Sequence, residues 1–389
     1  MDAYIVAGYR TAFGKAKKGS LRFTRPDDMA THVIKHLIDS LPDFDVNRVD
    51  DLIVGNALPE AEQGLNMARM IALTSLPMHV GGVTVNRYCA SGLETIAMAS
   101  AKIHAGHADV IVAGGTESMS LIPMGGYKIV PNHHVTNEHP DWYFGMGLTA
   151  EAVAREYDVS REECDEFAVR SHQRAAKALE ADTFKDEIVP MELEEVYYKD
   201  GKKQTRKFTH AKDEGVRPDS TVDALAKLRP VFAKDGVVTA GNSSQTTDGA
   251  AFVLVVSEAI LKEYNLTPIA QLKGYGVAGV NPKIMGIGPV EAVPKALKTA
   301  GLSLNDITTT ELNEAFATQS VAVIKKLGLD PETTNPHGGA IAMGHPLGCT
   351  GAKLSIQAIN ETKRRGGKYG MVTACVGGGQ GIAGIFEVL

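Results

Sequence analysis

The same succession of predicted elements occurs twice in this chain, about 260 residues apart, and this repetition restricts the fold more than any other feature. Each copy begins with a strand, continues with a helix and returns to a strand. The three elements cover residues 4–6, 26–40 and 50–56 in the first copy, and residues 274–276, 289–300 and 304–313 in the second. We therefore expect two similar halves whose matching loops meet at a shared interface.

Each copy then continues with a second helix and a strongly apolar strand. An Ala-rich helix is expected from Cys89 to Ala105, and Val110–Ala113 is an apolar run that ends in two glycines. A helix from Gly344 onward and the strand Gly370–Ala374 repeat this order. Continuous apolar strands that alternate with helices are typical of a parallel-type sheet covered on both faces. The predicted fold class is therefore α/β, with two duplicated halves.

The segment between the two halves has a different character and reads as an insertion. A helix over 161–181 begins with Ser160 and Glu163 in the order of a capping box, and Asp200-Gly201 is typical of a hairpin turn. Insertions of this size usually form lids or binding subdomains. The predicted division is a first half (1–118 and 241–265), an inserted loop subdomain that helps to bind the ligand (119–240) and a second half (266–389).

Composition excludes several classes of protein. The net charge of -6 provides no basic field for nucleic acid, and no apolar run approaches the ~20 residues that a membrane helix needs. The first residues lack the charged-then-apolar order of a signal peptide, and the last four are not a peroxisomal signal. We therefore expect a protein of the bacterial cytoplasm that binds neither nucleic acid nor membrane.

The chain has four cysteines, whose spacing fits neither a disulfide framework nor a metal knuckle. Cys89 is the candidate nucleophile, because it falls where a strand passes into a helix. The N–H groups at a helix start are expected to stabilise a thiolate and lower its pKa. The small residues Ala90, Ser91 and Gly92 leave room for a ligand. The alternative is a small buried hydrophobic residue, the commoner role of cysteine and the one expected of Cys164 and Cys349.

Three more candidates occupy turns or strand ends. His345 lies in a turn rich in glycine and proline, where it could act as a base or be merely solvated. Cys375 precedes the glycine run 377–381, which could form an oxyanion hole or simply a turn between strands. Asn313 ends a predicted strand and could donate an amide N–H to a ligand or cap a helix. All of them fall at equivalent positions of the two halves, which favours a common site.

The motifs around these residues resemble those of the thiolase family, and the similarity runs from end to end. They are Asn86–Gly92, Asn313–Ala317, Gly338–Gly348 and Cys375–Gly381, together with Arg10–Gly14 and Thr239–Ser244. The resemblance implies the thiolase fold, with two βαβαβαββ halves forming a layered αβαβα core. It also implies acyl transfer between coenzyme A thioesters.

The resemblance implies a role for each site residue. Cys89 would be the acylated nucleophile, His345 its base and Cys375 the acid that protonates the leaving enolate. One oxyanion hole would combine His345 with a water held by Asn313, and the other the N–H groups of Cys89 and Gly377. Ser244 would lie near the pantetheine arm of coenzyme A and Arg217 near its adenine or phosphate end, although Ala224 stands where synthetic members have a serine.

The resemblance also bears on ligands and partners. Coenzyme A and acyl-CoA are expected as substrates, with no permanently bound cofactor. A metal site built from His133, His134 and His139 is not expected, because no predicted strand or helix fixes their spacing. We expect a homodimer or homotetramer, which could join a partner with hydratase and dehydrogenase activities.

One departure indicates the type of thiolase. Gly145 stands where synthetic acetoacetyl-CoA thiolases have the histidine of a His-Met-Gly triplet, which should open the acyl pocket. We therefore predict a degradative 3-ketoacyl-CoA thiolase of fatty-acid β-oxidation. The alternatives are a synthetic acetoacetyl-CoA thiolase and a thiolase-fold protein that binds lipid or coenzyme A without catalysis. A ketosynthase is disfavoured by the Cys375 motif.

Overall fold

The computed structural model describes residues 2–389 of the chain. The first half folds around a mixed sheet. Its elements are β1 (Ala3–Arg10), β2 (Gly14–Lys15), α1 (Pro26–Asp39), β3 (Asp51–Gly55), α2 (Met67–Ser75), β4 (Val83–Val85), α3 (Ser91–His104), β5 (Val110–Ser118) and β8 (Thr247–Ser257). The strand order is β1-β8-β5-β3-β4. β3 is parallel to β4 and β5, whereas β8 is antiparallel to β5 and β1.

The second half repeats this arrangement. Its elements are β9 (Ala270–Gly279), α9 (Gly288–Ala300), β10 (Ile307–Leu312), α10 (Ala317–Leu327), α11 (Ala340–Met343), α12 (Leu347–Arg364), β11 (Tyr369–Val376) and β12 (Gln380–Val388). The order β9-β12-β11-β10 matches β1-β8-β5-β3 of the first half, which confirms the predicted duplication. The predicted strand at 304–306 is wrong, because Leu304–Asp306 form a 3-10 turn before β10.

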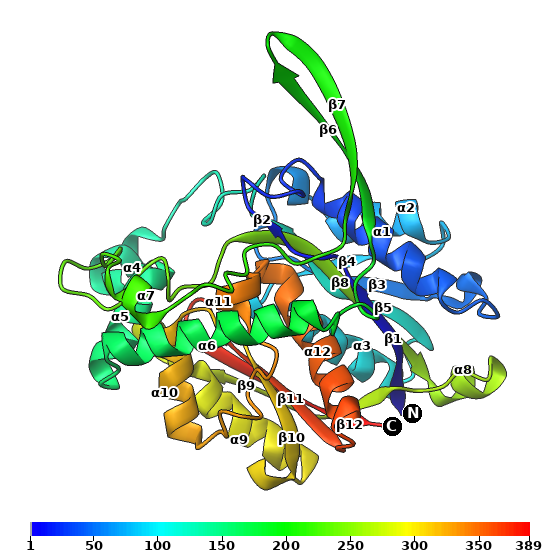
Figure 1. Cartoon of the computed structure of the whole chain (residues 1–389). Coiled ribbons are helices and arrows are strands. Elements are labelled where there is room, and N and C mark those ends of the chain that lie inside the picture. Colours follow the sequence, from blue (N-terminus) through cyan, green and yellow to red (C-terminus); the bar gives the residue numbers. More distant parts are fainter. Residues whose placement is uncertain (1) are drawn as a thin grey trace.

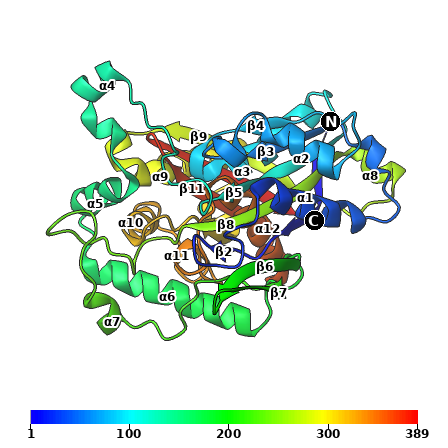
Figure 2. The same cartoon turned by 90° about the horizontal axis from the view of Figure 1, so that it is seen from above.

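Helices and sheets alternate in layers, as the αβαβα prediction requires (Figures 1 and 2). α1 and α2 pack against one sheet, α3 and α12 lie between the two sheets, and α9 and α10 pack against the other. The sheets join at a single pairing, Ile5 with Ala270. Glycines bring the central helices together: a Cβ on Gly92 would lie 2.5 Å from the Ala352 nitrogen, and one on Gly351 would lie 2.3 Å from the Leu93 nitrogen. This close approach matters because α3 and α12 begin next to Cys89 and His345.

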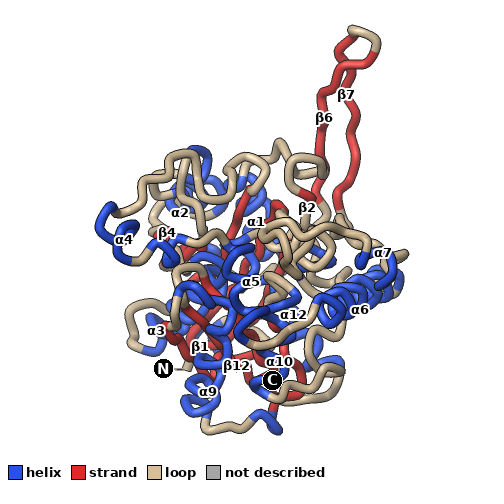
Figure 3. Tube along the Cα trace, turned by 90° about the vertical axis from the view of Figure 1, so that its left-hand side faces the viewer, coloured by secondary structure: helices blue, strands red, loops and turns tan. Residues whose placement is uncertain are grey.

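The intervening segment contributes smaller elements at one side of the layers. They are α4 (His133–Glu138), α5 (Met146–Glu156), α6 (Arg161–Glu180), β6 (Met191–Lys199), β7 (Lys202–His210) and α7 (Val222–Ala226), and α8 (Glu258–Glu263) follows β8. The capping box at Ser160 is confirmed. So is the hairpin, whose β6 and β7 project from the body in Figures 1 and 3. The division of the chain into three parts stays a prediction. None of the helices within 2–389 is both long and apolar enough to span a bilayer.

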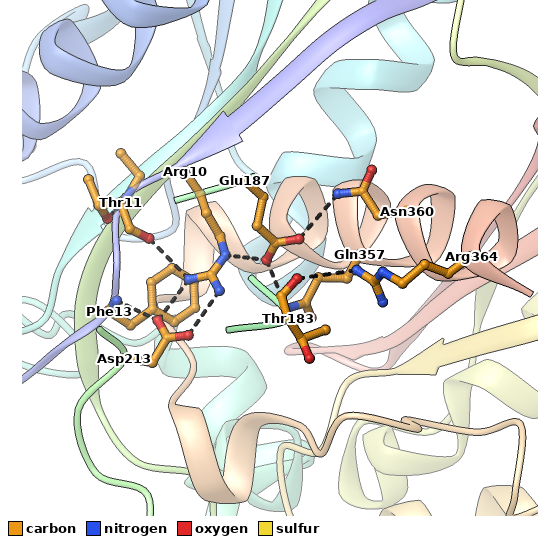
Figure 4. Close-up of polar contacts among 10 residues, drawn as sticks. Arg10, Thr11, Phe13, Thr183, Glu187, Asp213, Gln357, Asn360 and Arg364 are labelled. Atoms are coloured by element: carbon orange, nitrogen blue, oxygen red, sulfur yellow. Dashed lines mark hydrogen bonds and ion pairs between the residues drawn. The ribbon is translucent and has the colours of Figure 1, made fainter. Parts of the chain in front are cut away.

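A buried arginine connects the first half, the inserted segment and α12 (Figure 4). Arg10 contacts Glu187 through Nε at 2.7 Å and Asp213 through both terminal nitrogens at 2.7 and 2.9 Å. Glu187 also accepts hydrogen bonds from Gln357 and Asn360 of α12. Since Arg10, Glu187 and Asp213 are all buried, each charge depends on the others for compensation.

Replacing Arg10 by methionine is expected to lower the free energy of unfolding by about 3–5 kcal/mol, because two buried carboxylates lose their counter-charge. Urea denaturation followed by circular dichroism measures the loss. The matched control is Arg25→Met, which breaks an exposed pair with Asp27 and should cost under ~1 kcal/mol. Equal losses in the two variants would contradict the prediction.

Candidate active site

Cys89 lies in a rigid turn between β4 and α3. Tyr88, directly before it, has a φ of 43°, in the left-handed region. The turn is held by Asn86, whose side chain accepts the Tyr88 N–H at 2.8 Å, and by Ser91, whose hydroxyl accepts the Arg87 N–H at 2.9 Å. This geometry directs the backbone N–H groups of Cys89 and Gly377 at the Cys89 sulfur.

The predicted low pKa of Cys89 is wrong for the free protein. Burial raises the pKa of this thiol to about 11, and the negative charge of Glu117 acts in the same direction. The N–H groups of Gly377 and Cys89 oppose this shift but are outweighed. Cys89 is therefore a protonated thiol at neutral pH and needs a base to become a nucleophile.

His345 has the properties of such a base. Its Nδ1 lies 2.6 Å from the Thr350 hydroxyl, which donates its own proton to the Pro346 carbonyl at 2.9 Å. Thr350 must therefore accept the Nδ1 proton, which leaves the lone pair on Nε2. Burial, with the positive charge of Lys353, lowers the pKa of His345 to about 3, so the ring is neutral. A neutral imidazole whose Nε2 carries no proton can accept one.

Asn313 follows β10 and faces this histidine. Its side-chain nitrogen lies 3.2 Å from His345 Nε2, and Gln319 fixes its backbone by donating to the Asn313 carbonyl at 3.1 Å. The alternative that Asn313 caps a helix is wrong, because α10 begins later, with Phe316 as its N-cap. Its Oδ1 is buried and accepts no hydrogen bond from residues 2–389. The amide is thus held with one oxygen available for a ligand.

Cys375 and Gly377 come from the end of β11. Cys375 is fully buried, and burial, together with the nearby Cys89, raises its pKa, so it is a thiol at neutral pH. The glycine run does form the turn between β11 and β12, with Gly378 and Gly379 at φ values of 77° and 82°. The same turn presents the Gly377 N–H to Cys89. The glycine run is therefore both a turn between strands and a source of a backbone N–H donor at the site.

A cavity of about 460 Å³ opens beside these groups. Cys89, His345 and Ser244 lie along it, and most of its wall is apolar. The apolar wall is formed mainly by Met119, Met124, Met146, Met285, Leu148, Phe232, Phe316 and Leu347. A Cβ on Gly145 would meet no atom within 4 Å, whereas one on Gly147 would lie 2.3 Å from the Phe232 ring. Gly145 therefore lines the cavity and borders open space, and the wider acyl pocket inferred from it stays a prediction.

Other candidates lie outside this cavity. Arg217 does not line it, and its backbone N–H donates to His172 at 3.1 Å. Cys164 and Cys349 are buried in hydrophobic cores, as expected of structural residues. His133 and His134 belong to α4, so the expectation that no helix would order them is wrong. Within 2–389 no group of metal-ligating side chains is brought together.

The sequence interpretation missed Glu117 and Thr350. Glu117, near the end of β5, is buried and accepts hydrogen bonds from the backbone N–H groups of Ala57 and Gly348, both at 2.8 Å, and from Gln63 at 2.6 Å. It thereby holds the start of α12 against the end of β3, and with it the position of His345 relative to Cys89. The sequence could have indicated Glu117, because a carboxylate in an otherwise apolar strand needs buried hydrogen-bond partners.

Comparison with known proteins agrees with this fold and site. Residues 3–259 match the N-terminal domain model of thiolases and residues 266–388 the C-terminal domain model, so the chain belongs to the thiolase family. It is 54% identical to a 3-ketoacyl-CoA thiolase of Bacillus subtilis over 389 residues, covering 100% of this chain and 99% of the relative. A peroxisomal 3-ketoacyl-CoA thiolase of Arabidopsis thaliana is 43% identical over 99% of this chain and 87% of its own length.

Solved structures give the same result. Human mitochondrial 3-ketoacyl-CoA thiolase in complex with CoA matches with a TM-score of 0.89 and 40% identity, over 100% of this chain and 98% of that one. Bacillus anthracis acetyl-CoA acetyltransferase also matches with a TM-score of 0.89, at 39% identity over 100% of this chain and 99% of that one. The fold alone therefore does not separate these two activities.

Proposed function

We propose that the protein is a 3-ketoacyl-CoA thiolase (acetyl-CoA C-acyltransferase), which cleaves 3-ketoacyl-CoA with coenzyme A to give acetyl-CoA and a shortened acyl-CoA. The observation that carries the proposal is the composition of the site. Cys89 and a neutral His345 line the same apolar cavity, and two backbone N–H groups point at the Cys89 sulfur. Buried Cys375 lies close enough to Cys89 for the charge of a Cys89 thiolate to raise the pKa of Cys375.

In the first half-reaction, Nε2 of His345 accepts the Cys89 proton and the sulfur attacks the 3-keto carbon. The Cα–Cβ bond then breaks, its electron pair forms the enolate of acetyl-CoA, and Cys375 gives that enolate its proton. The enolate oxygen is stabilised by His345 and by a water that Asn313 holds. The N–H groups of Cys89 and Gly377 stabilise the oxyanion on the acyl carbon, each such donor being worth ~10²–10³ in rate.

In the second half-reaction, coenzyme A replaces acetyl-CoA. Its thiol loses a proton to Cys375, and the resulting thiolate attacks the acyl carbon on Cys89. The Cys89 sulfur leaves and recovers its proton from His345, so both thiols and the histidine return to their starting states. Ser244, on the cavity wall, contacts the pantetheine arm, and Arg217, which lies outside the cavity, approaches the phosphate end of coenzyme A. Coenzyme A is thus a substrate, and no bound cofactor or metal takes part.

A chain-length profile of thiolysis by the purified protein tests the proposal. We expect cleavage of C8 and C10 3-ketoacyl-CoA at rates at least comparable with acetoacetyl-CoA, which fits fatty-acid β-oxidation. Cleavage of acetoacetyl-CoA alone would favour the synthetic acetyl-CoA C-acetyltransferase and overturn the degradative assignment. Binding of acyl-CoA without turnover would favour the non-catalytic alternative.

Gly145→His is expected to shorten the acceptable acyl chain, because the new side chain enters the open part of the cavity. The kcat/KM for a C10 substrate should fall ~10–100-fold, with acetoacetyl-CoA changed by less than ~3-fold. Glu180→His, at the exposed end of α6, is the matched control. A uniform loss over all chain lengths would contradict this role of Gly145.

We also propose a homodimer or homotetramer in the bacterial cytoplasm. β4 is an edge strand that begins with the exposed Val83, and the exposed Met70 and Met78 lie in the segment before it. A second copy of the chain would cover such an edge. Association with a partner that carries hydratase and dehydrogenase activities would deliver the 3-ketoacyl product directly to this site. Sedimentation of the purified protein measures its oligomeric state.

A further inference from the structure

The Cys89 turn and the glycine turn come from different halves of the protein, yet their relative position decides the proposed acyl transfer. Cys89 follows β4 in the first half, and Gly377 follows β11 in the second. The Gly377 N–H nevertheless donates to the Cys89 sulfur. The first turn is held within its own half by Asn86 and Ser91, and the second by the Val280 N–H, which donates to the Gly379 carbonyl at 2.7 Å. Something must therefore fix one turn against the other.

One side-chain hydrogen bond joins the two turns. Arg87, two residues before the nucleophile, donates from a terminal nitrogen to the side-chain oxygen of Gln380 at 3.0 Å. Gln380 directly follows the glycine turn, and its amide nitrogen lies 3.4 Å from the Gly377 carbonyl. Two hydrogen bonds connect residues 86–92 with residues 375–381 in the described part of the chain, 2–389. One is the bond from Gly377 to Cys89, and the other is this bond from Arg87 to Gln380.

The arginine is held in place from its other side. Glu94 of α3 accepts two hydrogen bonds from Arg87, at 2.6 and 3.2 Å, and a third from the Tyr275 hydroxyl of β9. A bidentate pair of this kind fixes the plane of the guanidinium group. The Arg87 side chain is 27% exposed and that of Glu94 is 13% exposed, so solvent competes only in part.

A ring contact accompanies the hydrogen bond. A Cβ on Gly377 would lie 3.3 Å from the Tyr88 ring, so that ring packs directly on the Gly377 backbone. Because Tyr88 holds a left-handed backbone conformation, its ring position is coupled to the turn that presents Cys89. The two contacts act on the same residue, one at the Gly377 carbonyl and one at its α-carbon.

We propose that Arg87 and Gln380 form a clamp between the two halves that sets the distance from the Gly377 N–H to the Cys89 sulfur, and that both are positioning residues for the acyl transfer. The inference rests on the proposed function. It adds that part of the oxyanion hole is controlled by an arginine and a glutamine that do not line the cavity. Misplacing a reacting group by ~1 Å can cost ~10²-fold in rate.

The decisive variant is Gln380→Met, which keeps the side-chain volume and leaves the Arg87–Glu94 pair intact. We expect kcat for thiolysis to fall ~10–100-fold with KM changed less than ~2-fold, because the donor is needed mainly in the transition state. Arg87→Met should cause at least a similar loss, since it also removes the pair with Glu94. The double variant should lose no more than the worse single variant, because each single variant already breaks the Arg87–Gln380 contact. Arg48→Met, which breaks the distant pair with Glu263, is the control for removing an arginine.

Alkylation of Cys89 by iodoacetamide, measured against pH without substrate, gives a second readout. Besides burial, the charge that raises the pKa of Cys89 is that of Glu117 of β5. The other titratable groups nearby are Cys375 of β11, whose own pKa Cys89 raises, and His345, which lines the same cavity. None of these residues is altered. Loss of the Gly377 hydrogen bond should move the midpoint of alkylation to higher pH in Gln380→Met, with an unchanged thermal midpoint of unfolding.

The outcomes separate the two proposals. A wild-type kcat and alkylation midpoint in Gln380→Met would overturn the clamp, as would losses in the two single variants that multiply in the double variant. A wild-type protein that cleaves no 3-ketoacyl-CoA would overturn the proposed function instead. In that case the alkylation midpoint would still decide whether Arg87 and Gln380 position Gly377 against Cys89.

Discussion

Replacing Cys89 by alanine is expected to lower kcat for thiolysis by ~10⁴-fold or more, because no covalent acyl-enzyme can form. The fold should survive, since alanine fits the space of a buried cysteine whose neighbours Ala57, Met119 and Leu347 form a small apolar cluster. Steady-state assay with a C8 3-ketoacyl-CoA measures the loss, and binding of acyl-CoA to the variant shows that the cavity remains intact.

A matched control is Cys164→Ala, which removes a buried thiol that does not line the cavity and should leave kcat within ~2-fold. Labelling adds a second check. Stoichiometric iodoacetamide should modify Cys89 and abolish activity in the wild-type protein, and acyl-CoA should protect it. Because the pKa of Cys89 is about 11, the rate of labelling should still be rising at about pH 9. Substantial thiolysis by Cys89→Ala would refute covalent catalysis.

The architecture could be predicted because local patterns and the tertiary fold agree. Apolar runs such as Val110–Ala113 became buried strands, and the capping box at Ser160 starts α6. Duplication then places Cys89 and His345 at the starts of the two central helices, which glycines bring into contact. The roles of Cys89, His345, Cys375, Asn313 and Gly377 come from family motifs and stay predictions.

Electrostatic properties could not be predicted, because they depend on burial by residues far apart in the sequence. The start of a helix indicated a low pKa for Cys89, but burial outweighs the N–H groups and raises it. The position of the proton on His345 Nδ1 is set by the Thr350 hydroxyl, which must accept there because it donates its own proton to the Pro346 carbonyl. Glu117 belongs to no recognisable sequence motif, although its carboxylate connects the end of β3 to the start of α12. A protonated thiol beside a neutral histidine avoids a buried ion pair until substrate arrives.

Replacing Cys375 by serine is expected to separate the roles of the two thiols. A serine hydroxyl is a much weaker acid, so protonation of the enolate and deprotonation of coenzyme A should both slow, and kcat should fall ~10²–10⁴-fold. Cys89 keeps its own base and N–H donors, so its alkylation by iodoacetamide should change less than ~3-fold. The loss in kcat should appear at every acyl chain length, because Cys375 acts on the acetyl-CoA part common to all substrates.

The ionisation of Cys375 supports this assignment. Burial against Met285, Ala315 and Phe316, together with the nearby Cys89, raises the pKa of this thiol. It therefore carries a proton throughout the neutral range and can donate it to an enolate, whereas a thiolate there could not. If Cys375→Ser retained kcat but lost alkylation of Cys89, Cys375 would instead serve to activate the nucleophile. If both readouts stayed at wild-type values, the acid would have to be a group other than Cys375.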